Sequence, residues 1–130
     1  MCYNAFDMSA SKKRILLVED DNFLNQLYTD LLKKEGYEVT SVIDGETALE
    51  KIQTNSWDLI LLDIVLPGKS GFEVFAEVSK KSKPKYPIIF MTNLDSSDKD
   101  KKQLEQATGY WTKSNMSPPE FIANVKKILH

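Results

Sequence analysis

The chain of 130 residues carries a formal net charge of −2, and 42% of its residues are hydrophobic and 28% charged. This length predicts a single domain that can bury a hydrophobic core, and the composition is typical of soluble globular proteins. The chain has no basic tract of the kind that binds nucleic acid. No apolar stretch approaches the roughly 20 residues that are needed to span a bilayer.

The single cysteine, Cys2, excludes an internal disulfide, and no cluster of cysteine and histidine predicts a zinc site. This cysteine content fits the reducing cytoplasm. The first segment, residues 1–11, lacks the apolar core of a signal peptide and is expected to be a disordered leader. We therefore expect one domain over residues 12–130, with no room for an output domain after it.

Strand and helix patterns alternate along this domain. Short apolar runs that stop at a polar group are typical of buried parallel strands, whereas apolar residues at i, i+3, i+4 and i+7 are typical of helices. In chain order, the expected strands are residues 13–18, 37–42, 57–62, 88–92 and 109–112. The expected helices are, within a residue or two, 21–35, 44–54, 70–80, 97–107 and 117–129. The alternation predicts a (βα)5 fold, an α/β doubly wound sheet with helices on both faces.

Local signals mark where several helices begin. Asp44 is expected to cap the second helix. Ser70 and Ser117 each stand three residues before a glutamate, which is the pattern of a capping box at the start of a helix. The fourth helix has the weakest pattern, because only Leu104 and Ala107 in it are clearly apolar.

Polar side chains stand where the expected strands end. Glu19 and Asp20 follow the first strand, and Asp63 follows the third. Thr92 ends the fourth strand, and Lys113 follows the fifth. Because ligands of open parallel sheets bind outside the carboxyl ends of the strands, we expect these groups to form one site. Neighbouring carboxylates suit a hard divalent cation, and without a cation their repulsion raises the pKa of at least one of them.

Simpler interpretations are open for the single residues. Asp21 directly precedes the first helix and is expected only to cap it. Thr92 taken alone is an ordinary β-branched strand residue, and Lys113 taken alone is an exposed lysine. Tyr110 is as consistent with a half-buried strand aromatic as with a side chain that moves. His130, the only histidine, ends the chain and is not expected to bind metal or carry phosphate.

Together, these residues resemble the receiver domain of response regulators in two-component signalling, in the stand-alone form similar to chemotaxis regulators. The resemblance covers roughly residues 12–129. The matching residues are Glu19, Asp20, Asp63 with the stretch DIVLPGKSG that it begins, Thr92, Tyr110 and Lys113. The resemblance implies a flavodoxin-like receiver fold whose five parallel strands have the order 2-1-3-4-5.

The resemblance also implies a role for each site residue. Asp20 and Asp63 would bind Mg²⁺, the implied cofactor, directly. Glu19 would act on the ion through a water molecule, and the backbone carbonyl of Val65 would be a further ligand.

Asp63 would also be the phosphoacceptor. Its carboxylate would attack a phosphohistidine of a sensor histidine kinase or a phosphotransfer protein, and Lys113 and Thr92 would contact the phosphoryl group. Tyr110 would turn inward when Thr92 shifts toward that group. The chain would then be a signalling domain and not an enzyme in the usual sense, since it catalyses only its own phosphorylation and dephosphorylation.

The implied output surface comprises the fourth strand, the fourth helix, the fifth strand and the fifth helix, which would bind a downstream protein. We expect a cytoplasmic monomer or weak homodimer that binds neither nucleic acid nor membrane. Two alternatives stay open. One is a receiver-like binding module that works without phosphorylation, and the other is a small aspartate-based phosphohydrolase, for which the chain has no room for a large cap domain.

The sequence departs from the family pattern at two positions. Ser114 stands where the family usually has a proline after the lysine, often with a cis peptide, and a cis bond to serine would be costly. The loop 114–116 must then place Lys113 by other means. Asn93 stands where the family commonly has a small residue, and its larger side chain could restrict access to the phosphoryl group.

Overall fold

The computed structural model describes residues 12–80, 82–93 and 98–130, with the backbone alone for residues 98–100. Strands and helices alternate along this part of the chain. The strands are β1 (Arg14–Val18), β2 (Glu38–Val42), β3 (Leu59–Asp63), β4 (Ile88–Thr92) and β5 (Gly109–Thr112). The α-helices are α2 (Asn22–Lys34), α3 (Gly45–Thr54), α4 (Gly71–Ser79), α5 (Asp98–Leu104) and α6 (Pro118–Leu129), and the short 3-10 helix η1 (Lys113–Asn115) follows β5.

Every predicted strand and helix is present, and the largest differences concern two ends. β3 begins at Leu59 and not at residue 57, because Asp58 still belongs to the turn that binds the start of β1: its carboxylate accepts a hydrogen bond from the backbone of Arg14 at 2.7 Å. α5 ends at Leu104 and not at residue 107, because the chain must turn before Thr108 donates its backbone N–H to Ile88. The expected leader, residues 1–11, lies outside the described residues.

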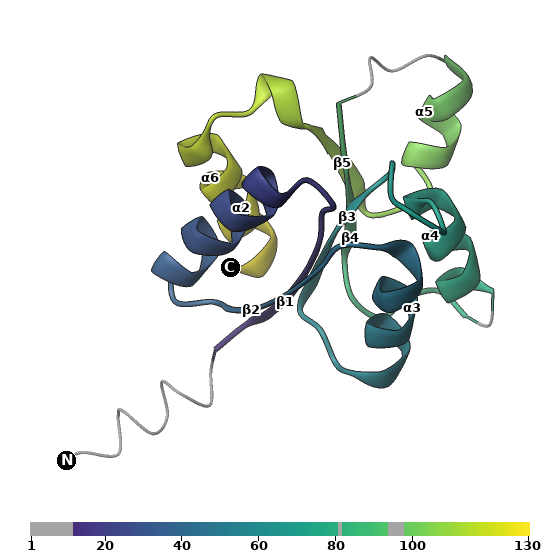
Figure 1. Cartoon of the computed structure of the whole chain (residues 1–130), viewed down its shortest axis with the longest axis horizontal. Coiled ribbons are helices and arrows are strands. Elements are labelled where there is room, and N and C mark those ends of the chain that lie inside the picture. Colours follow the sequence, from purple (N-terminus) through teal and green to yellow (C-terminus); the bar gives the residue numbers. More distant parts are fainter. Residues whose placement is uncertain (1–11, 81, 94–97) are drawn as a thin grey trace.

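The five strands form one sheet in the order β2-β1-β3-β4-β5, and every neighbouring pair is parallel. This confirms the predicted fold and strand order. In Figure 1, α2 and α6 lie on one side of the sheet and α3 and α4 on the other, so that helices cover both faces.

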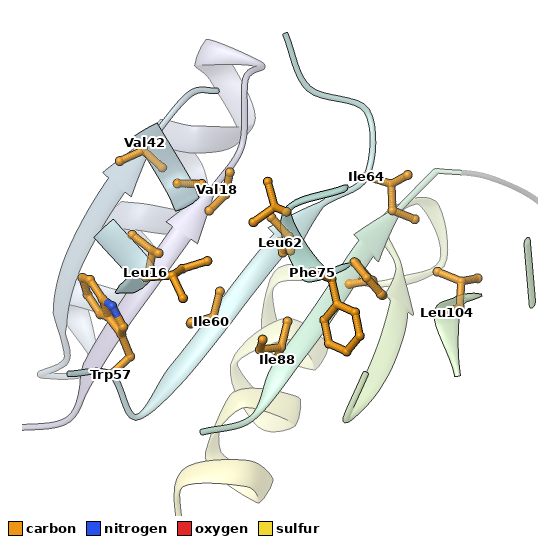
Figure 2. Close-up of a cluster of buried hydrophobic side chains, with 14 residues drawn as sticks. Leu16, Val18, Val42, Trp57, Ile60, Leu62, Ile64, Phe75, Ile88 and Leu104 are labelled. Carbon is orange, nitrogen blue, oxygen red and sulfur yellow. The ribbon is translucent and has the colours of Figure 1, made fainter. Parts of the chain in front are cut away.

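The sheet is buried because its central strands are apolar on both faces. Alternate residues of a strand point to opposite faces, which divides the core in two. The core under α3 and α4 contains, from the strands, Leu16, Val18, Val42, Ile60, Leu62, Ile88 and Phe90 (Figure 2). The core under α2 and α6 contains, from the strands, Ile15, Leu17, Leu59, Leu61, Ile89 and Met91. Since each fully buried leucine or isoleucine contributes roughly 1.5–3 kcal/mol, the central strands β1, β3 and β4 form a rigid base for the loops at their ends.

The polar residues between strands and helices fix where each helix begins. The side chains of Asp21 and Asp44 accept hydrogen bonds from backbone N–H groups at the starts of α2 and α3. Ser70 and Ser117 begin α4 and α6 with complete capping boxes, as the sequence predicts. Each cap sets the direction in which the chain leaves the carboxyl end of the sheet. None of the described helices is both long and apolar enough to cross a membrane.

Candidate functional site

The carboxyl ends of β1, β3, β4 and β5 surround one pocket of about 360 Å³. Its lining comprises Glu19, Asp20, Asp21, Leu24, Asp63, Val65, Thr92, Asn93 and Lys113. All the groups that the sequence places at strand ends are therefore together, as expected for a parallel sheet. Tyr110 packs instead against the core under α3 and α4.

Three carboxylates form the acidic part of the pocket. Glu19, Asp20 and Asp63 each offer an oxygen atom, and these atoms lie within 4.8 Å of one another. Glu19 and Asp63 are buried, whereas Asp20 is exposed. Clustered carboxylate oxygens with one open side are the donor set that Mg²⁺ prefers, so these residues fit the cation that the sequence predicts.

Lys113 enters the acidic cluster from the end of β5. Its Nζ donates to Oε1 of Glu19 at 2.5 Å and to Oδ2 of Asp63 at 2.9 Å. The lysine side chain is only 6% exposed. The simpler interpretation of Lys113 as an exposed lysine is therefore wrong, because the carboxylates at the ends of β1 and β3 bind its ammonium group.

The loop after Lys113 replaces the proline of the family pattern with a helical turn. No cis peptide bond is present among the described residues, which include Lys113 and Ser114. The chain passes directly from β5 into η1, and the backbone N–H of Met116 donates to the carbonyl of Lys113 at 3.3 Å. This turn leaves Ser114 and Asn115 at the surface and directs Lys113 inward.

Burial and charge change the protonation of this cluster. The pKa of Glu19 is raised from 4.5 to about 7: burial raises it most and repulsion from Asp63 adds to this, while the hydrogen bond from Lys113 lowers it. The predicted repulsion between carboxylates thus contributes to the raised pKa of Glu19, but burial is the larger cause. For Lys113, burial alone would lower the pKa, but the hydrogen bonds to Glu19 and Asp63 raise it above its usual value. The lysine therefore stays charged.

The turn between β1 and α2 holds the first two acids. The backbone N–H of Glu19 donates to the carbonyl of Val42 at 3.1 Å, and the side chain of Asp21 caps α2 through the N–H of Leu24 at 2.9 Å. Asp21 is therefore a helix cap, as predicted. The side-chain amide of Asn25 donates to the carbonyl of Glu19 at 2.8 Å. Sequence reasoning missed Asn25, since an amide on an amphipathic helix gives no sign of the carbonyl it binds.

The loop after Asp63 folds back against the end of β3. The N–H of Gly71 donates to the carbonyl of Ile64 at 2.8 Å. A Cβ atom at position 71 would lie 2.2 Å from the carbonyl oxygen of Asp63, so only glycine allows α4 to begin this close to the strand. This return leaves Val65 exposed at the opening of the pocket.

Thr92 and Tyr110 lie on neighbouring strands. Thr92 is buried at the end of β4 and lines the pocket. Tyr110 is half-buried and stands opposite Phe90 in the β4–β5 pairing. Phe90 and Thr92 are two residues apart and share one face of β4. A shift of Thr92 would therefore change the packing around Tyr110. The inward turn of Tyr110 itself stays a prediction.

The side-chain contacts of His130 are with Tyr37 and not with residues of the pocket. Its Nε2 is 3.1 Å from the hydroxyl of Tyr37, which directly precedes β2. His130 is not among the residues that line the pocket, and its expected lack of a role in metal binding or phosphate transfer stays a prediction.

Comparisons with known proteins agree with this geometry. Residues 15–126 match the family model of the response regulator receiver domain. A CheY-like receiver domain protein from Methanospirillum hungatei is 31% identical, with a TM-score of 0.82 over 92% of this chain and 94% of that chain. The response regulator TrrA from Thermotoga maritima, crystallised with Mg²⁺ and BeF, is 38% identical, with a TM-score of 0.79 over 90% and 99% of the two chains. The chemotaxis protein CheY4 of Vibrio cholerae is 30% identical, with a TM-score of 0.80 over 92% and 100%. With a fold, a pocket and a family model in agreement, the chain belongs to the response regulator receiver domains.

Proposed function

We propose that the protein is a phosphoacceptor switch that takes a phosphoryl group onto Asp63 from the phosphohistidine of a sensor histidine kinase or a phosphotransfer protein. The observation that carries the proposal is the position of Asp63. Its carboxylate ends the central strand β3, faces the Nζ of Lys113 at 2.9 Å and belongs to an acidic cluster in an open pocket.

The transfer needs one bond to form and one to break. An oxygen of the Asp63 carboxylate attacks phosphorus, the phosphorus–nitrogen bond of the phosphohistidine breaks, and the imidazole leaves with the electron pair. The product is an acyl phosphate, and carboxylates are known acceptors of this kind. Positioning and charge supply most of the catalysis in phosphoryl transfer. Lys113 provides a point charge beside the acceptor, and Thr92 provides a hydroxyl that donates to a phosphoryl oxygen.

The residues in the pocket fit Mg²⁺. Glu19, Asp20, Asp63 and the backbone carbonyl of Val65 would hold the ion, which supplies positive charge to offset that of the phosphoryl oxygens. TrrA, the relative crystallised with Mg²⁺ and BeF, supports this assignment. Lys113 alone does not neutralise the cluster, because its ammonium group binds Glu19 and Asp63 and leaves Asp20 without a cation.

The opening of the pocket suits a protein donor. Among the described residues, the exposed large hydrophobic side chains are Phe23, Ile43 and Val65, with exposed fractions of 74%, 55% and 66%. They follow the carboxyl ends of β1, β2 and β3, so they lie on the edge of the sheet that holds the acidic pocket, and Val65 lines the pocket itself. Exposed apolar residues gathered around one opening favour contact with another protein. A small phosphodonor would not need such a contact surface.

The phosphorylated site would change a protein-binding surface. A phosphoryl group adds about −1.5 to −2 charge units, and this charge would draw Thr92 and allow Tyr110 to turn inward. The surface formed by β4, α5, β5 and α6 would then bind a downstream protein. The proposal includes a cytoplasmic location, which the single cysteine supports, and a monomer or weak homodimer.

Incubation with Mg²⁺ and acetyl phosphate tests the proposal. The protein should gain one phosphoryl mass that hydroxylamine removes. Asp63→Asn should abolish the gain, whereas Asp30→Asn, the same change at an exposed residue of α2, should leave it intact. Uptake by Asp63→Asn at the wild-type rate would refute the assignment. No uptake by the wild type would favour a binding module, and steady hydrolysis of general phosphate esters would favour a phosphohydrolase.

A further inference from the structure

Asn25 contacts the backbone on both sides of Asp20. It lies in the first turn of α2, and its side-chain Nδ2 donates to the carbonyl of Glu19 at 2.8 Å. Its backbone N–H donates to the carbonyl of Asp21 at 2.8 Å. Asp20 is thus held between two residues that are fixed by the same asparagine.

The same amide joins three elements of the fold. Nδ2 of Asn25 also approaches the carbonyl of Val42 at 3.5 Å, and this carbonyl accepts the backbone N–H of Glu19. On its other side, Oδ1 of Asn25 lies 3.5 Å from the hydroxyl of the buried Thr29. The amide nitrogen faces two carbonyl oxygens and the amide oxygen faces a donor, so the orientation of the group is determined.

The position of Asp20 depends on the backbone of the turn more than the positions of Glu19 and Asp63 do. Glu19 and Asp63 are buried and bind Lys113, whereas Asp20 is exposed. No described residue donates a hydrogen bond to the Asp20 carboxylate, so the backbone must set its direction. A loop that is ordered before a ligand arrives binds it more tightly, because the cost of ordering is not paid on binding.

We infer that Asn25 is a positioning residue, which orders the Glu19–Asp21 turn so that Asp20 is in place to bind a divalent cation. The inference rests on the proposed function, since it assigns the turn to Mg²⁺. Replacing a residue that hydrogen-bonds to a metal ligand and orients it typically lowers metal affinity 10- to 100-fold. Asn25 is one step further away, because it acts through the backbone.

The test is a titration of the unphosphorylated protein with Mg²⁺, followed by NMR shifts of the β1–α2 turn. Asn25→Ala should weaken Mg²⁺ binding roughly tenfold. Asn25→Gln keeps the amide donor and should recover part of the affinity. The matched control is Asn124→Ala, which removes another half-buried amide, on α6, whose Nδ2 contacts the sulfur of Met116 at 3.5 Å. The control should bind Mg²⁺ as the wild type does.

Phosphorylation by acetyl phosphate gives a second measurement. Asn25→Ala should need more Mg²⁺ for half-maximal rate but should reach nearly the wild-type rate at saturating Mg²⁺. A lowered melting temperature in EDTA with an unchanged Mg²⁺ affinity would show that Asn25 is only structural and would overturn the inference. If Asn25→Ala does not fold, Asn25→Ser takes its place with the same expected direction. A wild type that binds Mg²⁺ but takes up no phosphate would refute the proposed function while leaving this titration valid.

Discussion

Each end of the sheet holds a basic side chain that is paired with one or more carboxylates. At the amino end, Nε of Arg14 binds Glu38 at 2.8 Å, and its guanidinium lies 5.0 Å from the ring of Trp57. At the carboxyl end, Lys113 binds Glu19 and Asp63. The side chain of Arg14 is 37% exposed, whereas that of Lys113 is 6% exposed.

The difference between the two ends lies in solvation and in the balance of charge. Arg14 remains in contact with water, its donors also reach the carbonyl of Ser56, and its ion pair resembles those that add little to stability. At the carboxyl end, two buried carboxylates share one buried ammonium group beside the exposed Asp20, and the pKa of Glu19 rises to about 7. An ion pair alone is therefore no sign of a functional site, whereas an excess of buried charge of one sign is.

The largest expected effect comes from removing each cation. Lys113→Met leaves two buried carboxylates without a partner, and in EDTA near pH 8 it should lower the free energy of unfolding by about 3 kcal/mol. Arg14→Met keeps an apolar stem near Trp57 and should cost less than about 1 kcal/mol. Urea unfolding of both variants measures the difference. Equal losses would mean that burial does not distinguish the two ends.

The second largest effect is the pH dependence that Glu19 gives to the free energy of unfolding. Its pKa is about 7 in the folded protein against 4.5 as the reference for the unfolded chain. Between these values the folded state binds more protons than the unfolded state, so stability is present at low pH and is lost as the pH rises toward 7. In EDTA, this contribution should amount to on the order of 3 kcal/mol.

Glu19→Gln removes the titration and should flatten this part of the stability curve. Glu38→Gln, the matching change at the amino end, should leave the curve as it is in the wild type. Urea unfolding at several pH values from about 4.5 to 8 provides the measurement. A curve for Glu19→Gln that still falls over this interval would assign the titration to another group.

Much of this contrast could be predicted from the sequence, but its geometry could not. The apolar runs and the capping residues are local signals, and they gave all the strands and the start of each capped helix. The end of α5 differs from the prediction, because Leu104 and Ala107 alone do not define a helical face. The strand order came from the resemblance, since periodicity does not say which strands pair. The sequence also identified Lys113, but its burial between Glu19 and Asp63 depends on contacts between residues far apart in the chain.

A smaller effect is expected from Mg²⁺ itself. The ion binds only the folded protein, so a concentration tenfold above its dissociation constant should stabilise the wild type by about 1.4 kcal/mol. Asp20→Ala should remove most of this gain, because the exposed acid completes the cluster. Asp58→Ala, at the amino end, should lower stability by loss of its bond to Arg14 but should keep the full response to Mg²⁺. Melting curves with and without Mg²⁺ measure both, and an unchanged response in Asp20→Ala would place the ion elsewhere.

The smallest expected effect is a change of NMR shift, and the two tryptophans report it from the two ends. Trp57 packs beside Arg14, whereas Trp111 lies on β5, one residue after Tyr110, with its ring against Phe121. Beryllofluoride with Mg²⁺ imitates the phosphoryl group and should shift the indole signal of Trp111 while leaving that of Trp57 in place.

Thr92→Ala removes the hydroxyl proposed to follow the phosphoryl group, although Asp63 can still bind beryllofluoride. The shift of Trp111 should therefore become smaller without a loss of binding. Thr112→Ala is the matched control, because Thr112 stands opposite Thr92 in the β4–β5 pairing yet is not among the residues that line the pocket. If Trp111 responds equally in the wild type and in Thr92→Ala, the signal reaches β5 by another route, such as the movement of Lys113, which directly follows that strand. If Trp57 responds as strongly as Trp111, the change spreads through the whole sheet, and the carboxyl end is not a separate switch.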